Sequence, residues 1–353
     1  MKVLMTADAV GGVWTYALDL VEGLAEHDVE VVLALLGPAP TAEQRRELAR
    51  SSLAGWAHRG FALEWMGDAE EDLERTGWWL LELCAAARPD LLHLNGYGVA
   101  ATPTPVPKLV VGHSCVLSWH EAVRGRPAGP EWSWYRRAVV RGLGRADALV
   151  APTAAMLDEL VRLYAPHCPR EVIPNGLGRG PRPLAKEELV LGVGRVWDAG
   201  KNLDALRRVA HDLPWPVVVA GAGGELGRIS PERLAELYGR AAIFAAPARY
   251  EPFGLSALEA GLARCALVLG DIPSLREVWG EAALFVDPSD DEALGATLRA
   301  LIRAPAAVKA LGAAARARAL RYTRELMTAG YLDLYERLLT EVAEPAPQLE
   351  VAR

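Results

Sequence analysis

The sequence is poor in lysine and cysteine and has no long apolar run, and each shortage excludes a class of protein. Lysine occupies only five of its 353 positions and the formal net charge is −7, which argues against general nucleic-acid binding. Four widely separated cysteines without a CxxC pair favour free thiols in a reducing compartment over disulfides or a zinc site. No segment approaches the ~18 apolar residues of a membrane span, and the early Asp8 argues against a signal peptide. We therefore expect a cytoplasmic protein without a transmembrane segment.

Short apolar runs alternate with longer segments of helical period, a pattern typical of parallel sheets covered by helices on both faces. Strands are predicted at 2–6, 29–35, 61–65, 90–94, 108–112, 147–151, 170–173, 189–194, 216–220, 242–246, 266–269 and 283–286. Helices are predicted at 13–26, 41–51, 70–87, 131–144, 153–164, 202–212, 230–240, 255–264 and 290–303, and from 306 to about 342.

A Pro- and Gly-rich segment at 174–183 separates two such series and is interpreted as a linker. The chain length also favours two domains of ordinary size. We therefore predict an α/β protein with two Rossmann-like domains facing a central cleft, an N-terminal domain at 1–175 and a C-terminal domain at 184–325, followed by a helix at 326–342. Because open α/β sheets bind ligands outside the carboxyl ends of their strands, the cleft is the expected site.

The segment 251–260 has the pattern of a phosphate-binding helix start. Pro252 fixes φ and Gly254 permits a tight turn, so a helix is predicted to begin near Gly254. The unpaired N–H groups and the dipole at that end favour a phosphate. Glu251 and Glu259 can bind hydroxyl groups on either side, which suits a nucleotide sugar. The alternative is that the acidic residue merely compensates the helix dipole.

Two other loops also follow predicted strands. One contains Arg195 and Lys201 and enters a helix predicted to be capped near Asn202. Arginine can hold a phosphate bidentately and lysine adds a point charge, so the pair can neutralise a diphosphate without a metal. The alternative is two solvated cations. The other loop has a glycine pair ending at Gly12 before a helix, which suits either a close ligand or a plain tight turn.

A histidine and a group of aromatic residues complete the candidates. His113 follows the strand at 108–112 and can donate to a developing charge or a sugar hydroxyl, although a lone histidine is more often structural. Tryptophans and arginines gather in 118–141, which suits sugar stacking, a weak peripheral membrane contact, or a lid with a core-facing helix. No DxD-type pair follows a strand, so we expect neither a metal nor another cofactor.

Together these motifs resemble the retaining glycosyltransferases of the GT-B fold, specifically glycosyltransferase family 4 (group 1), over nearly the whole chain. The match is carried by the Glu-x7-Glu spacing from Glu251 to Glu259, by the Gly-Arg…Lys loop, and by Val-Ile-Pro-Asn-Gly at 172–176. The resemblance implies that His113 and Glu251 are catalytic. It further implies that the diphosphate is held by Arg195, Lys201, Gly12, Gly254 and Leu255, the ribose by Glu259, and the base near Ile229. The final helix is then expected to cross back to the N-terminal domain.

One segment departs from the family pattern. Between Gly224 and Pro231 the family usually has a further helix and strand, which this chain compresses into 225–230. From the resemblance we predict a metal-independent, retaining transfer of a sugar from a nucleoside-diphosphate sugar to a hydroxyl acceptor. Two alternatives stay open: a GT-B-fold nucleotide-sugar epimerase and a non-catalytic nucleotide-sugar-binding protein.

Overall fold

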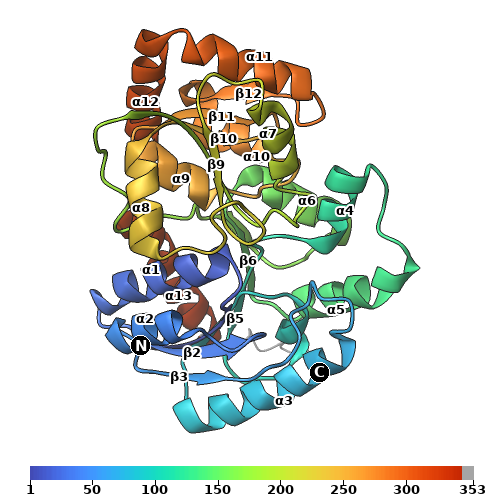
Figure 1. The fold of residues 1–353 in the computed structure, drawn as a ribbon. Coiled ribbons are helices and arrows are strands. Elements are labelled where there is room, and N and C mark those ends of the chain that lie inside the picture. The colour runs from blue at the N-terminus through green and yellow to red at the C-terminus, as the bar shows by residue number, and fades with distance from the viewer. Residues whose placement is uncertain (344–353) are drawn as a thin grey trace, which may run out of the picture.

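A computed structural model describes residues 1–343 and contains two parallel sheets, one in each half of the chain (Figure 1). The first, in the order β3-β2-β1-β4-β5-β6-β7, consists of β1 (Lys2–Asp8), β2 (Glu30–Leu36), β3 (Gly55–His58), β4 (Leu91–Leu94), β5 (Lys108–Val111), β6 (Ala148–Ala151) and β7 (Arg170–Val172). The second, in the order β12-β11-β10-β8-β9, consists of β8 (Glu187–Val193), β9 (Val217–Ala220), β10 (Ala241–Ala246), β11 (Ala266–Gly270) and β12 (Leu284–Val286). All paired strands are parallel, which confirms the predicted α/β fold.

Helices cover both faces of each sheet. The first sheet is accompanied by α1 (Gly12–Ala25), α2 (Ala42–Arg50), α3 (Glu70–Ala87), α4 (Val116–Arg124), α5 (Ser133–Leu143), α6 (Ala154–Tyr164) and the short 3-10 helices η1 (Gly98–Ala101) and η2 (Pro130–Trp132). The second is accompanied by α7 (Leu203–Ala210), α8 (Pro231–Arg240), α9 (Leu255–Leu262), α10 (Pro273–Trp279), η3 (Gly280–Ala282), α11 (Asp291–Ile302) and α12 (Pro305–Ala319). Successive strand residues point into different apolar cores: Val3 and Leu4 lie in two separate clusters, as do Val190 and Leu191. This two-sided burial is typical of parallel sheets.

The last helix, α13 (Arg324–Ala343), crosses back to the first domain, as expected (Figure 1). Its apolar side chains, including Tyr331, are buried in the same core as those of α1. The Tyr335 hydroxyl lies 2.6 Å from Nδ1 of His93 in β4, and Nε2 of His93 lies 3.0 Å from the Tyr16 hydroxyl of α1. Burial lowers the pKa of His93 to about 3, so its neutral ring joins the two hydroxyls and ties α13 to the sheet.

The predicted strand at 61–65 is wrong, because the edge strand β3 lies earlier, at Gly55–His58, where it pairs with β2. Residues 61–65 are not in a strand since Glu64 turns its carboxylate inward. That carboxylate accepts hydrogen bonds from the N–H groups of Tyr97 at 3.0 Å and Gly98 at 2.7 Å, where η1 begins. A tertiary contact therefore overrides a sequence pattern that favoured a strand.

The helical segment predicted from 306 to about 342 is interrupted, because residues 320–323 separate α12 from α13, and α13 contains the helix predicted at 326–342. The chain changes domain there. Leu177 N–H donates to Tyr322 O and Arg324 N–H donates to Leu177 O, and both donor–acceptor distances are 3.3 Å. The predictions also missed the short helices α4 and α10. The linker predicted at 174–183 contains no helix or strand, whereas the domain boundaries stay predictions.

Candidate active site

The loop after β10 places a helix N-terminus at the interface of the two domains. Gly254 has φ +93°, a left-handed conformation that favours glycine, and α9 starts at the next residue, as predicted. No side chain caps this end of the helix. Its first N–H groups therefore face the cavity described below, which Gly254, Leu255 and Ser256 help to line.

Both predicted cations lie at this cavity, and each is paired with a carboxylate. A guanidinium nitrogen of Arg195 lies 2.9 Å from Asp198 Oδ2, and Lys201 Nζ lies 2.5 Å from Glu251 Oε2. Burial raises the pKa of Asp198, but the hydrogen bond and charge of Arg195 outweigh it and leave that pKa below its ordinary value. Arg195 Nε is buried without a hydrogen-bond partner within the described chain. One guanidinium donor is therefore unpaired among the described residues, which is costly for a buried group unless a ligand or water supplies an acceptor.

Asn202 does not act as the predicted side-chain cap. It occupies the N-cap position of α7 in the left-handed region at φ +52°, and its side chain makes no capping bond. Its Nδ2 donates instead to Pro247 O at 2.9 Å and Pro288 O at 2.8 Å. The asparagine thus anchors the loop with Arg195 and Lys201 to the two loops that follow β10 and β12.

The glycine loop after β1 meets the loops that carry Arg195 and Leu255 in the opposite domain. A Cβ on Gly11 would lie 2.8 Å from a guanidinium nitrogen of Arg195, and one on Gly12 would lie 3.4 Å from Leu255 Cδ1. Gly12 also begins α1, which has no side-chain cap. The close approach shows why a larger residue at position 11 would disturb Arg195.

His113 is held in one orientation by Asn95, which follows β4. Nδ2 of Asn95 donates to Thr6 O at 2.6 Å, so its Oδ1 faces His113 and accepts a hydrogen bond from Nε2–H at 2.8 Å. Burial lowers the pKa of His113 to about 3, so the ring is neutral at physiological pH. Its Nδ1 then has a free lone pair, and the Tyr16 ring packs edge-on against the imidazole with centroids 4.4 Å apart.

Glu259 lies on α9 with a half-buried side chain. Burial raises its pKa to about 7, and proximity to the Tyr238 hydroxyl only partly offsets this effect. The Tyr238 hydroxyl is buried without a partner at hydrogen-bond distance in the described structure. A ligand hydroxyl placed beside Glu259 would therefore meet both a carboxyl group and a phenol.

A cavity of about 860 Å³ between the domains brings most of the predicted residues together. It is lined by Gly12, His113, Arg195, Lys201, Glu251, Gly254, Leu255 and Glu259. Ile229 lines instead an adjoining cavity of about 1410 Å³, which Glu259 also borders. The segment from Gly221 to Ser230 forms turns between β9 and α8, so the compressed connection is confirmed. Ile229, which was predicted to lie near the base, thus lines a different cavity from the residues predicted to bind the diphosphate, and Glu259 borders both cavities.

The N-terminal half of the cavity has an aromatic wall. Trp65, Trp119, His120, Trp132 and Tyr135 line it, whereas Trp134 is buried in the domain core. Some aromatic side chains of segment 118–141 therefore face the cavity and others face the core, and sugar stacking stays a prediction. No helix within residues 1–343 is long and apolar enough to cross a membrane, and a peripheral membrane contact stays a prediction.

Three residues that shape the site were not predicted: Asn95, Asp198 and Tyr250. Asn95 and Asp198 follow strands at the same sheet edges as the predicted residues, so the rule that located His113 and Arg195 also applied to them. Tyr250 also follows a strand, β10, but the role of its side chain could not be predicted, because the partners of its hydroxyl lie in the other domain. Among residues 1–343 no group of three or more His, Cys, Asp or Glu side chains is arranged to hold a metal ion.

Two sequence families match successive parts of the chain. Residues 10–178 match "Glycosyltransferase Family 4", and residues 223–318 match "Glycosyl transferases group 1". A glycogen synthase of Mycobacterium tuberculosis is 28% identical over 273 residues, which are 65% of this chain and 64% of that protein. An O-antigen chain mannosyltransferase B of Escherichia coli is 31% identical over 177 residues, 43% of this chain and 44% of that protein. The matched regions thus span less than two thirds of these relatives.

Solved structures match over nearly the full chain. Sucrose-phosphate synthase from Thermosynechococcus elongatus has a TM-score of 0.77 at 19% identity and covers 97% of this chain and 100% of that one. Anabaena HepE in complex with UDP and glucose has a TM-score of 0.74 at 14% identity and covers 96% of this chain and 100% of that one. At these identities the likeness concerns the fold.

Proposed function

Because this chain belongs to glycosyltransferase family 4, group 1, we propose that it transfers a sugar from a nucleoside-diphosphate sugar to a hydroxyl acceptor, with retention of configuration and without a metal. The observation that supports this most is the convergence of Arg195, Lys201, the free N-terminus of α9 and Glu251 on one interdomain cavity. These groups match the chemistry of a diphosphate with a sugar on one side.

The donor diphosphate binds at the start of α9. Helix N–H groups and the dipole favour an anion there, and Arg195 supplies an unpartnered Nε–H. Lys201 adds a second positive charge once it exchanges Glu251 for phosphate oxygens. On the ribose side of the donor, Glu259 and the Tyr238 hydroxyl offer hydrogen-bonding groups.

The same cations stabilise the transition state. Cleavage of the glycosidic bond leaves negative charge on the departing diphosphate, and preorganised donors in a site with little water stabilise that charge strongly. Glu251 accepts hydrogen bonds from sugar hydroxyls. The neutral His113 offers its Nδ1 lone pair to a further hydroxyl while Asn95 fixes the ring.

Retention without a covalent intermediate is our proposal for the stereochemistry. A double displacement needs a carboxylate free to attack the anomeric carbon. Asp198 is hydrogen-bonded to Arg195, Glu64 to the backbone of η1, and Asp8 to Val10 N–H at 2.8 Å. A front-face displacement, in which the departing diphosphate takes up the acceptor proton, needs no such nucleophile.

The aromatic wall favours a transferase over the two alternatives. Beyond His113 the cavity continues along Trp65, His120 and Trp132 in the N-terminal domain. An epimerase or a nucleotide-sugar sensor needs no second substrate there, whereas a transferase needs a surface for the acceptor. Aromatic faces suit the ring of a sugar acceptor.

The test begins with thermal stabilisation by UDP, GDP, ADP and dTDP in the presence of a chelator. We expect one nucleotide to raise the melting temperature, and Lys201→Ala to remove that shift. Lys309→Ala is the matched control, since Lys309 is an exposed lysine on α12. Transfer from the corresponding nucleotide sugar, with NMR of the product anomer, then tests catalysis and retention. Equal shifts in both variants, or no shift with any nucleotide, would contradict the donor site.

A further inference from the structure

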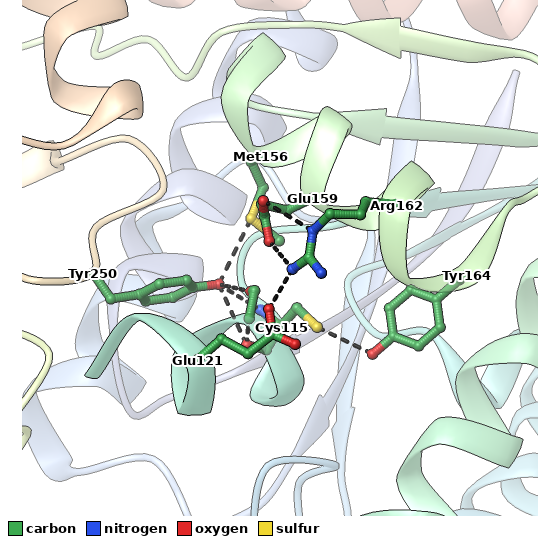
Figure 2. A network of polar contacts seen from close by, with 8 residues as sticks. Cys115, Glu121, Met156, Glu159, Arg162, Tyr164 and Tyr250 are labelled. Atoms are coloured by element: carbon green, nitrogen blue, oxygen red, sulfur yellow. Dashed lines mark hydrogen bonds and ion pairs between the residues drawn. The ribbon is translucent and has the colours of Figure 1, made fainter. Parts of the chain in front are cut away.

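Tyr250, immediately before Glu251, crosses the domain interface with its side chain. Its hydroxyl lies 2.8 Å from the backbone N of Cys115 and 3.0 Å from Ser118 Oγ (Figure 2). Cys115 is the N-cap residue of α4, in the N-terminal domain. The phenol thus accepts the N–H of the N-cap residue itself, the bond that an N3 side chain makes in a capping box, whereas the N–H of Val116 donates to the Tyr135 hydroxyl at 3.4 Å.

One arrangement of protons satisfies every group in this contact. Cys115 N–H donates to the Tyr250 hydroxyl, the Tyr250 hydroxyl donates to Ser118 Oγ, and Ser118 Oγ donates to Cys115 O at 3.2 Å. Cys115 and Ser118 are both buried, with 1% and 3% of their surface exposed. Loss of the hydroxyl would therefore leave a buried N–H without its partner, which is costly.

The contact joins the two predicted catalytic residues through short stretches of backbone. Glu251 is the next residue after Tyr250, and His113 lies two residues before Cys115. On the other side of Glu251, Pro252 O accepts a hydrogen bond of 2.9 Å from Thr153 Oγ1, at the start of α6. Glu251 is thus flanked on both sides by hydrogen bonds to the opposite domain.

The helix that receives Tyr250 is itself held firmly. Glu121 of α4 pairs with Arg162 of α6, which also pairs with Glu159 (Figure 2). The indole N–H of Trp119 in α4 donates to Asp198 Oδ1 at 3.2 Å, and Asp198 holds Arg195. The same short helix therefore contacts both loops that supply the donor site.

We propose that Tyr250 is a positioning residue, whose hydroxyl locks the Glu251 loop onto the cap of α4 and so sets Glu251 against His113 when the domains close. This assignment rests on the proposed transfer reaction. Among the described residues the Tyr250 hydroxyl makes no hydrogen bond to Arg195 or Lys201, and the bond from its backbone N–H to Gly200 O at 3.1 Å is kept in a phenylalanine variant. Loss of the hydroxyl therefore affects alignment of the sugar rather than binding of the nucleotide.

The test compares Tyr250→Phe with Tyr322→Phe. The control removes a hydroxyl that donates to Val278 O at 3.0 Å within the C-terminal domain. For Tyr250→Phe we expect kcat to fall by about tenfold or more. A buried N–H without a partner makes the aligned arrangement of the two segments less favourable by about that factor. The donor KM and nucleoside-diphosphate affinity should stay within about twofold. Ser118→Ala, which removes one member of the same cycle, should give a smaller loss.

Amide hydrogen exchange gives a readout that does not depend on turnover. In Tyr250→Phe, exchange across residues 112–119 should become about tenfold faster, and in Tyr322→Phe it should not change. Unchanged exchange there, or a kcat within twofold of wild type, overturns the proposal. If wild-type protein transfers no sugar from any donor, the proposed function fails. Exchange alone then decides whether Tyr250 locks the two segments together.

Discussion

The raised pKa of Glu259 predicts that the stability of this protein falls as pH rises toward 7. Burial raises the pKa from 4.5 to about 7, a difference worth about 3 kcal/mol at ~1.4 kcal/mol per pKa unit. The folded protein therefore binds a proton that the unfolded chain releases between these two pH values. The stabilisation is fully present below pH 4.5 and is lost as pH rises through about 7. Water in the adjoining cavity would reduce the cost of burial, so about 3 kcal/mol is an upper figure.

Glu259→Gln isolates this contribution, because glutamine has a similar shape and does not titrate. Urea unfolding would be measured for both proteins at pH 5 and pH 8, and their unfolding free energies compared at each pH. Titration of every other group is common to both proteins and cancels in the comparison. From pH 5 to pH 8, wild type should lose about 2 to 3 kcal/mol relative to the variant. An unchanged difference between the two proteins would refute the buried, protonated state of Glu259.

Three other predictions concern neighbouring parts of the site. Gly11→Ala should weaken nucleoside-diphosphate binding about tenfold in calorimetry, because the new Cβ would lie 2.8 Å from a guanidinium nitrogen of Arg195. Gly60→Ala is the control and should leave binding unchanged, because a Cβ at position 60 would have no heavy atom within 4 Å. His113, whose pKa is about 3, should show no NMR titration between pH 5 and 8, and an inflection near 6.5 would contradict the buried neutral ring. Tyr335→Phe removes the hydroxyl that is hydrogen-bonded to the buried imidazole of His93, and it should lower the unfolding free energy by about 1–2 kcal/mol in urea titrations. An unchanged unfolding midpoint would mean that the packing of α13 does not depend on this bond.

The sequence predicted those features that depend on local patterns. The start of α9 at Leu255 was predicted correctly because Pro252 and Gly254 fix the local backbone. The predicted strand at 61–65 was wrong because Glu64 bonds to the backbone of η1, which lies more than thirty residues away. Helix α4 was missed because its start has no local capping signal and its N-cap residue is held by Tyr250 from the other domain.

The site residues divide in the same way. Position at the end of a strand was enough to place His113, Arg195 and Glu251 at one cavity, because parallel strands end at a common edge. Their pairing was not predictable, since it depends on how the two loops after β8 and β10 face one another. The role of Ile229 near the base stays a prediction, taken from a family pattern in which the segment before α8 contains a further helix and strand. Here that segment is only a series of turns, and Ile229 lines the adjoining cavity.

The pairing of Lys201 with Glu251 gives the proposed reaction an order of events. In the structure the 2.5 Å contact occupies both Lys201, the proposed phosphate-binding cation, and Glu251, the proposed sugar-binding carboxylate. A diphosphate at the start of α9 competes for Lys201, and each phosphate oxygen that Lys201 binds releases Glu251 toward the sugar hydroxyls. Binding of the nucleotide thus prepares the group that holds the sugar. A free sugar, which lacks the diphosphate, would have to break the ion pair without replacing its charge, so it should bind far more weakly than the nucleotide sugar.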